Sequence, residues 1–395
     1  MTETESAKHA PPPPMPAPGS PSTERGAPTA RLVGVDLARA LAVFGMFTVH
    51  VGASRFSGGG AGTWLWELAN GRASALFATL AGFSLMLIAG RREPKTGLAG
   101  RQAKARIVIR AVVLLALGTA LAMTDFGDAV ILNSYGVYFL LALPLVRLRA
   151  RTLATIAVAL AVIAPQVAFG LKALLHGPIA NSLNAYDPLE RLSGVGLLDI
   201  LLTGMYPALT WMTFVVTGMA LGRLELTSGA VQRQLAVLGP ALIVLGYGVS
   251  WLALRLSGGQ PPTEEAPGSV SDAWGLLAAE PHTSSTFDLV GSLGVAITVL
   301  LSATVAMDRL PWLRRLATPL IAVGTMSLTL YVGHILVILA LPGEAVTPPE
   351  SASAALLCAF VSGATLFAAV WSRFFRRGPL EYLLNSTTRL ANSVR

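Results

Sequence analysis

The sequence predicts an all-α polytopic membrane protein, a bundle of about 10 transmembrane helices with both termini in the cytoplasm. Its composition is 53% hydrophobic and 13% charged, whereas a typical soluble domain has about 25% charged residues. Apolar runs of about twenty residues, the length needed to cross a bilayer, recur along the chain. Basic residues gather in alternate loops between these runs, and this asymmetry predicts the orientation.

Residues 1–30 form a separate region with a different composition. The stretch from Ala10 to Pro21 is rich in proline and has no apolar periodicity, so it should be a disordered, extended cytoplasmic tail. No short apolar segment followed by a small-residue cleavage site precedes the first apolar run. A cleaved signal peptide is therefore not expected.

Ten apolar runs follow, and each is a candidate membrane span. The fourth is the shortest, and Pro207 should break the sixth into two pieces, because proline lacks the N–H that a helix interior requires. The runs cover residues 33–52, 69–90, 107–124, 129–146, 152–173, 197–222, 232–254, 286–307, 316–341 and 353–374.

The loops between these spans carry charges of alternating sign, which predicts the orientation of each span. Basic residues follow the even-numbered spans: Arg91, Arg92, Lys95, Arg101, Lys104, Arg147, Arg149, Arg151, Arg223, Arg233, Arg309, Arg314, Arg315, Arg373, Arg376 and Arg377. Acidic residues occupy the odd loops: Asp125, Asp128, Asp187, Glu190, Glu264, Glu265, Asp272, Glu280, Glu344 and Glu350. The even loops are therefore expected in the cytoplasm, and Arg55, Lys172, Arg191 and Arg255 are isolated exceptions outside.

Several function classes are disfavoured by the residue inventory. The net charge of +8 does not indicate nucleic-acid binding, because the basic residues do not form a recognition surface with interleaved aromatics. The single Cys358 provides neither a disulfide nor a cysteine-ligated metal site. No histidine pair has the helical i, i+4 spacing of a metal site, so no metal is expected. Glycine-rich phosphate loops, nucleophile elbows and dinucleotide fingerprints are absent from the sequence.

Arg39 and His50 are the most informative residues, because both lie in the first span. At about 100° per residue, eleven steps return to within roughly 20° of the same helix face, and they climb about 16 Å. Ionisable groups inside a span are costly and indicate function. His50 is a candidate general base or acyl carrier, since imidazole titrates near neutral pH. Arg39 is a candidate clamp for a phosphate-bearing donor, and Arg39 and Asp36 are the predicted donor-binding residues.

Both residues also have purely structural interpretations. His50 could contact headgroups or bond to a neighbouring helix at the membrane interface. Arg39 could pair with Asp36 one turn below, or extend its side chain toward the cytoplasm.

A second set of polar residues is expected in the extracytoplasmic half, where it could form an acceptor pocket. A structural role is the alternative for several of them: Arg72 could anchor the second span, His334 could be a packing histidine, and the segment from His282 to Asp288 could be a solvated loop. The predicted pocket residues are Asn70, Arg72, Tyr206, Trp211, His282, Asp288, Tyr331 and His334.

The arrangement of an arginine, ten residues and a histidine resembles the first-span signature of the transmembrane acyltransferases. These include the acyltransferase-three proteins and the heparan-alpha-glucosaminide N-acetyltransferases. Several segments are more similar to the YeiB branch of this group and to its C-terminal domain of unknown function. They cover residues 35–46, 71–84, 206–211, 326–334 and 378–382.

The resemblance implies a domain organisation and a site. It implies an acyltransferase-like transmembrane half at 31–225, a YeiB-type C-terminal transmembrane domain at 226–385 and a tail at 386–395. In the heparan acetyltransferases, the position that corresponds to His50 looks like an asparagine. Their catalytic histidine lies in the loop that follows. The corresponding loop here, 51–68, contains no histidine, so the catalytic role of His50 is implied only by the similarity of the Arg39/His50 pattern to that of the acyltransferase-three proteins.

The resulting hypothesis is an acyl-CoA-dependent membrane acyltransferase of the cell envelope, in the plasma or inner membrane. It would move an acyl group, expected to be acetyl, from cytoplasmic acyl-CoA to an extracytoplasmic glycan or glycolipid. Acyl-CoA is a co-substrate, and no resident cofactor is expected. The expected partners are the lipid bilayer, acyl-CoA, the acceptor and a second copy of the chain. The alternatives are a small-solute transporter or channel, with Arg39 and Arg72 as pathway charges, and a non-catalytic membrane protein.

Overall fold

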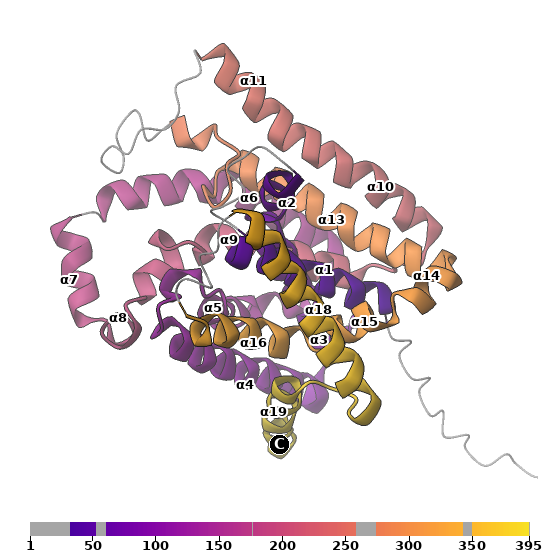
Figure 1. The fold of residues 1–395 in the computed structure, drawn as a ribbon. Coiled ribbons are helices and arrows are strands. Elements are labelled where there is room, and N and C mark those ends of the chain that lie inside the picture. Colours follow the sequence, from indigo (N-terminus) through magenta and orange to yellow (C-terminus); the bar gives the residue numbers. More distant parts are fainter. Residues whose placement is uncertain (1–31, 53–60, 176, 258–273, 343–349, 395) are drawn as a thin grey trace, which may run out of the picture. The chain divides into compact units, whose positions relative to one another are not determined.

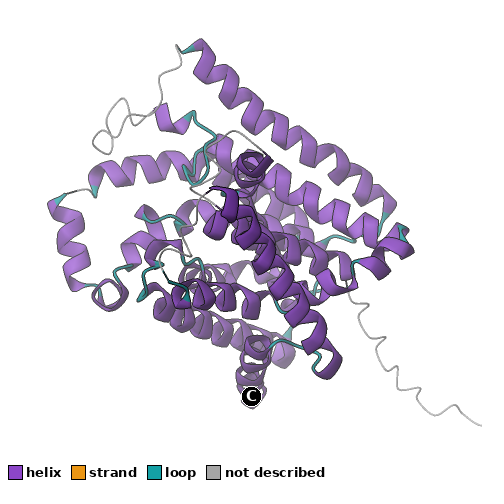
Figure 2. Ribbon diagram, viewed as in Figure 1, coloured by secondary structure: helices purple, strands orange, loops and turns teal. Residues whose placement is uncertain are grey.

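Helices make up all the regular secondary structure of the residues that the structure, a computed structural model, describes (Figure 2). These residues are 32–52, 61–175, 177–257, 274–342 and 350–394. The predicted N-terminal tail and most of the outer loop at 257–285 lie outside them. Residues 33–395 form one compact unit, and the predicted boundary at 225/226 remains a prediction.

The first half of the described chain contains the elements from α1 to α9. They are α1 (Val33–Gly52), α2 (Ala61–Ala69), α3 (Arg72–Ala89), α4 (Gly97–Ala122), η1 (Gly127–Ala129), α5 (Leu132–Ala142), η2 (Leu143–Arg147), α6 (Ala150–Leu174), α7 (Pro178–Tyr186), α8 (Pro188–Ser193), η3 (Asp199–Thr203) and α9 (Ala208–Arg223).

In the second half, α10 and α13 lie side by side (Figure 1). The elements are α10 (Gly229–Ile243), η4 (Val244–Gly248), α11 (Val249–Leu256), η5 (Trp274–Leu276), α13 (Thr286–Arg309), α14 (Pro311–Leu316), α15 (Thr318–Thr325), α16 (Ser327–Ala340), α18 (Glu350–Phe374), α19 (Pro379–Thr387) and η6 (Thr388–Ser393). The η3 and η4 segments are π-helices.

Seven helical spans among the described residues are long and apolar enough to cross a membrane, or eight if the bent pair α15–α16 is one span. The protein is therefore a multi-pass membrane protein. The two predicted spans that do not qualify are the fourth and the sixth. The fourth becomes the 11-residue α5 followed by η2, and the sixth is interrupted before Ala208. The predicted break at Pro207 is confirmed, because Pro207 caps the start of α9.

Helices α3 and α9 pack closely at the centre of the molecule. Gly82 of α3 lies against the backbone of Val215, and Gly218 of α9 lies against the backbone of Thr79. At both positions a Cβ would overlap a carbonyl oxygen of the partner helix. Small residues that let backbones approach are the usual means of association between membrane helices.

A carboxylate from α19 supports the break between α15 and α16, where the two helices meet at 83°. Glu381 accepts hydrogen bonds from Leu328 N at 2.7 Å, Thr329 N at 3.1 Å and Thr329 Oγ1 at 2.5 Å. These amides open α16 and have no partner within their own helix. The negative charge of Glu381 also lies at the positive end of the helix dipole.

The C-terminal residues 386–395, predicted as a tail, include the end of α19 and the helix η6, which packs against α4. Arg106 of α4 donates a hydrogen bond of 2.8 Å to Asn392 Oδ1. This contact joins the C-terminal helix η6 to α4, so it links the two predicted domains.

Arg223, predicted as a cytoplasmic loop charge, also has a structural role. Its side chain is buried at the end of α9. It donates hydrogen bonds to the carbonyl oxygens of Arg91, Val146 and Leu148. Charge-assisted bonds to three carbonyl groups join two loops to α9 and satisfy the buried guanidinium.

Candidate functional site

Arg39 is held in position by two neighbours. Its Nη1 lies 3.0 Å from Asp36 Oδ1, and its Nη2 donates to Ser84 Oγ at 2.6 Å. Ser84 in turn donates to the carbonyl oxygen of Leu80 one turn earlier in α3. The pairing with Asp36 is the structural interpretation offered by the sequence, and it is confirmed. It does not remove Arg39 from the site, because the arginine also lines a cavity.

This Arg39 cavity has a volume of about 300 Å³ and lies between α1, α3, α4, α5, the α15–α16 break and α19. Apolar and aromatic side chains form most of its wall, and Arg39, Arg110 and Glu381 provide the charges. Its volume is at the lower limit of small-molecule pockets, which span about 300–1,000 Å³. The wall suits a long apolar ligand with few polar contacts.

A second cavity of about 370 Å³ adjoins the first and shares Leu87, Ile88 and Arg110 with it. We call it the basic mouth, because its lining includes Lys95, Arg106, Arg110 and Arg389 and no acidic residue. Asn385, Thr388 and Asn392 complete its polar wall. Four cations without a carboxylate in the wall give this cavity a strongly positive lining, the chemistry that phosphate groups require of a binding site.

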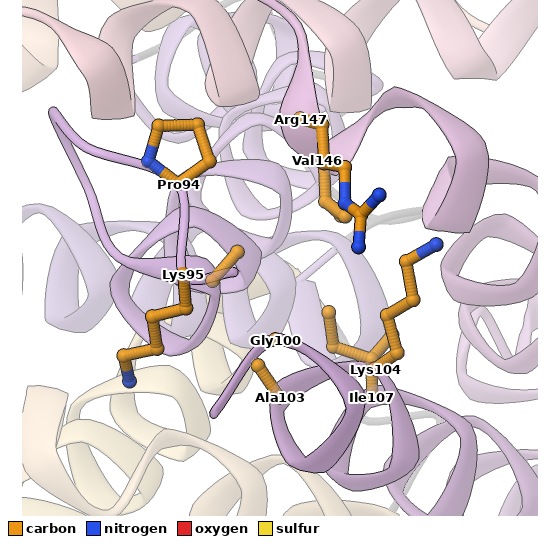
Figure 3. Close-up of a pocket in the computed structure, with 9 residues that line it drawn as sticks. Pro94, Lys95, Gly100, Ala103, Lys104, Ile107, Val146 and Arg147 are labelled. Carbon is orange, nitrogen blue, oxygen red and sulfur yellow. The ribbon is translucent and has the colours of Figure 1, made fainter. Parts of the chain in front are cut away.

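Two basic residues near Lys95 do not belong to the basic mouth. Lys104 and Arg147 line a small separate cavity of about 10 Å³, which has room for about one water molecule. Figure 3 shows the side chain of Lys95 directed away from those of Lys104 and Arg147. Lys95 therefore belongs to both cavities, whereas Lys104 and Arg147 lie apart from the mouth.

His50 meets His334 of α16. Nδ1 of His50 lies 2.9 Å from Nε2 of His334, and the two rings are inclined by 15°. His334 is 4% exposed, whereas His50 keeps partial exposure. Phe126 packs edge-on against His50, and Phe47 and Tyr331 pack against His334. The structure thus pairs the first-span histidine with a histidine 284 residues away in the chain.

Aromatic rings connect the Arg39 cavity to the histidine pair. Phe77 and Tyr135 line the cavity. Phe77 also lies near Tyr331, with ring centroids 6.2 Å apart, and Tyr331 contacts His334 at 5.3 Å. His50 does not line this cavity. Arg39 and His50, expected on one helix face, therefore do not share this cavity.

Arg72, at the first position of α3, is bound to the π-helix η4. Its Nε donates to Tyr247 Oη at 2.8 Å, and its guanidinium lies 4.6 Å from the centre of the Tyr247 ring. Its Nη1 also donates to the carbonyl oxygen of Glu67. Asn70 lies in the preceding turn, where its carbonyl oxygen accepts from Arg72 N at 2.8 Å.

Asp288 has a structural task at the start of α13. Its backbone N–H donates to Ser285 Oγ at 3.0 Å, and its carboxylate accepts from Ser284 N at 3.2 Å. This arrangement is similar to a capping box, except that the carboxylate accepts from Ser284, one residue before the N-cap Ser285. Ser292 links the carboxylate to the Arg72 network, because it lies 3.2 Å from both Asp288 Oδ1 and Tyr247 Oη.

His282 lies in the loop before α13 with a positive φ of 65°. Its ring stacks on Trp211 at 13° and meets Tyr206 edge-on. Burial lowers the pKa of His282, so its neutral form is favoured near neutral pH. Tyr206 and Trp211, on either side of the break before α9, are themselves buried.

The predicted acceptor-pocket residues thus fall into three clusters at the His50 end of the molecule: Arg72 with Asp288, His282 with Tyr206 and Trp211, and His334 with Tyr331. Their role in acceptor binding remains a prediction. No group of three or more His, Cys, Asp or Glu side chains in the described part of the chain could hold a metal ion.

Sequence reasoning missed the basic mouth and the cap on α16. Arg110 could have been recognised as a candidate site residue, because it is an ionisable residue inside the third apolar run. The loop pattern predicts only a topological role for Lys95, and Arg389 falls in the predicted tail at 386–395. Their convergence depends on η6 packing against α4, which no local pattern encodes.

Two family profiles match the chain over adjacent regions. The profile described as "Heparan-alpha-glucosaminide N-acetyltransferase, catalytic" matches residues 31–247, more than half of the chain. The profile described as "Protein of unknown function (DUF418)", which is YeiB-type, matches residues 267–391. No curated protein sequence matches the chain directly. The chain therefore belongs to the heparan-alpha-glucosaminide N-acetyltransferase-like family of membrane acyltransferases, with a YeiB-type C-terminal region.

Proposed function

We propose that the protein transfers an acyl group, most simply acetyl, from cytoplasmic acyl-CoA to an extracytoplasmic glycan or glycolipid. The loop charges favour an orientation with both termini in the cytoplasm. In this orientation the basic mouth faces the cytoplasm, and the His50–His334 pair lies toward the opposite side. A plasma or inner membrane location belongs to the same proposal.

The observation that carries this proposal is the adjoining pair of cavities. The basic mouth offers Lys95, Arg106, Arg110 and Arg389, and the Arg39 cavity continues from it with an apolar wall. Acyl-CoA has a matching division, with phosphates at one end and a long thin arm that ends in the thioester. Guanidinium groups bind phosphate through two parallel hydrogen bonds, which favours arginine at such a mouth.

The arm would extend from the basic mouth past Arg39 and then toward His50. The rise along α1 from Arg39 to His50 is about 16 Å. Phe77 and Tyr135 lie on this route, so their rings must rotate or shift when the donor binds. Arg39, oriented by Asp36 and Ser84, would bind a donor oxygen as the arm passes.

The transfer step requires a base at the acceptor. His50 would take the proton of an acceptor hydroxyl or amine as its oxygen or nitrogen attacks the thioester carbonyl carbon. The tetrahedral intermediate then collapses, the C–S bond breaks, and CoA leaves as the thiolate. The proton on His50 passes to the thiolate or to solvent, which restores the neutral imidazole and completes the proton balance.

Binding of CoA to the detergent-purified protein tests the donor side. Acetyl-CoA or CoA should raise the melting temperature of the wild-type protein, because a ligand that binds only the folded state stabilises it. Arg106→Ala and Arg389→Ala should each weaken CoA binding about tenfold, the loss expected when one exposed phosphate contact worth about 1.4 kcal/mol is removed.

Arg101→Ala is the matched control, since Arg101 is an exposed arginine on the same helix α4 that does not line the mouth. It should bind CoA like the wild type. Removal of the 3′-phosphate from CoA should reduce affinity in the wild type. Absence of any shift with all CoA species would contradict the proposal.

A small-anion transporter is the second candidate. The break of 83° between α15 and α16 beside a cavity that contains cations favours it, because broken helices form the binding sites of many transporters. Stabilisation by small anions without stabilisation by CoA would favour the transporter over the enzyme.

A further inference from the structure

We propose that His334 is a positioning residue that keeps His50 protonated at Nδ1 and leaves Nε2 of His50 free to accept a proton. This inference rests on the proposed acyl transfer for its consequence, although the tautomer itself can be measured without it. His334 belongs to the region matched by the YeiB-type profile, whereas His50 belongs to the acetyltransferase-type region. The pair is thus formed only when the two regions pack together.

The burial of the two rings gives them different roles. His334 is enclosed by Phe47, Tyr331 and His50, with ring centroids 4.8, 5.3 and 5.1 Å away. It is 4% exposed, which leaves little room for a substrate. His50 remains partly exposed and contacts Phe126 on its other side. His50 is therefore the reachable member of the pair, and His334 is the enclosed one.

One proton must lie between the two rings. A distance of 2.9 Å between Nδ1 of His50 and Nε2 of His334 is a hydrogen bond, and a neutral imidazole has one N–H donor and one acceptor nitrogen. Either His50 donates and keeps a free Nε2, or His334 donates and forces the N–H of His50 onto Nε2. Only the first arrangement leaves His50 able to act as a base.

The surroundings of His334 Nδ1 select the first arrangement. The backbone carbonyl groups of Leu330 and Tyr331 lie four and three residues earlier in α16, in the turn toward which a helical side chain leans. Nδ1 is buried and has no hydrogen bond of full geometry among the described residues. A bare lone pair facing carbonyl oxygens is repelled, whereas an N–H there is attracted. Nδ1 of His334 therefore carries the proton, and its Nε2 accepts from His50.

In many enzymes a second side chain accepts a hydrogen bond from the general base and so fixes its orientation. Here a neutral imidazole takes the place of the carboxylate that usually does this. When His50 takes the acceptor proton at Nε2, both of its nitrogens become donors. The N–H at Nδ1 then points at the lone pair of His334, which stabilises the imidazolium during the transfer.

Two variants of His334 test the positioning role. His334→Phe keeps the ring volume and removes the acceptor, whereas His334→Gln restores an acceptor oxygen. We expect His334→Phe to lower kcat about 10²-fold, within the range attributed to a general base, with KM for acyl-CoA and CoA binding unchanged. The kcat of His334→Gln should be at least tenfold higher than that of His334→Phe. Wild-type turnover in His334→Phe, or no recovery in His334→Gln with both variants folded, would overturn the inference.

Nitrogen-15 spectra of the wild-type protein labelled at its five histidines test the tautomer directly. The expected result is an Nδ1-protonated His50 that shows through-bond coupling to Nε2 of His334, assigned by loss of the signals in His50→Ala and His334→Phe. A proton on Nε2 of His50, or no coupling, would overturn the inference. If the wild type transfers no acyl group, the proposed function fails, and this spectrum still decides the tautomer.

Discussion

Replacement of His50 by alanine should abolish acyl transfer and leave donor binding intact. A general base contributes about 10²–10⁴-fold to the rate, and alanine removes both the proton acceptor and the contact with His334. CoA binding should be retained, because His50 lines neither the basic mouth nor the Arg39 cavity. The reduction in kcat is expected near the upper end of this range, since His334 is too enclosed to replace it.

The measurement is transfer of labelled acetyl from acetyl-CoA to envelope glycans, compared with CoA binding in the same preparations. Arg39→Ala is the contrasting variant, because Arg39 lines the Arg39 cavity, the proposed route of the donor arm. This variant should lose CoA binding and acyl transfer together. If His50→Ala retained wild-type transfer, His50 would not be the base, and the family's chemistry would have to use another residue in this chain.

Alanine at Gly218 should be among the most damaging single methyl additions to the transmembrane core. The new Cβ would overlap the carbonyl group of Thr79 and approach the amide of Phe83, and neither backbone can move without separating α3 from α9. Overpacking of a core costs about 1–3 kcal/mol, and occasionally more. Because both sides of this contact are backbone, a cost at or above that upper figure is expected. Gly82→Ala should act in the same direction against Val215.

Gly333→Ala is the matched control, because no atom lies within 4 Å of the Cβ position at this glycine of α16. Its melting temperature should equal or slightly exceed that of the wild type, since alanine favours the helix. Thermal unfolding in detergent, followed by the loss of the monodisperse species, compares the variants. Equal melting temperatures for Gly218→Ala and Gly333→Ala would show that α3 and α9 do not pack as described.

Most of the fold could be predicted from local patterns. The length of the apolar runs predicts the long spans. Pro207, which lacks the N–H that a helix interior requires, predicts the break before α9. The bend between α15 and α16 could not be predicted, because no residue inside the span at 316–341 requires it in the way Pro207 does. Glu381, more than fifty residues away, satisfies the amides that the bend exposes. A cap supplied by a distant helix has no local signature.

The site was predicted less completely, for a similar reason. Arg39, Asp36 and His50 could be found because ionisable residues are rare within apolar runs. The partner of His50 could not be assigned, because several histidines and tyrosines were equally available at that depth. Asp288 was interpreted as a pocket residue, yet the Ser285-x-x-Asp288 spacing is also a capping signature, and the structure uses it in that way.

The two profile-matched regions depend on each other at both ends of the site. At the donor end, Arg106 and Arg110 come from the acetyltransferase-type region, whereas Arg389 comes from the YeiB-type region. At the other end, His50 and His334 are divided in the same way. The C-terminal region is therefore part of the candidate site, and its removal should disrupt both donor binding and the histidine pair.

A structure of the protein bound to a non-transferable thioether analogue of acetyl-CoA tests the central claim most directly. The account predicts density for the phosphates beside Arg106, Arg110 and Arg389, an arm that passes Arg39, displaced rings at Phe77 and Tyr135, and an acyl end within reach of His50 Nε2. Density for the analogue at another surface, or an acyl end that stays on the Arg39 side of those two rings, would contradict it.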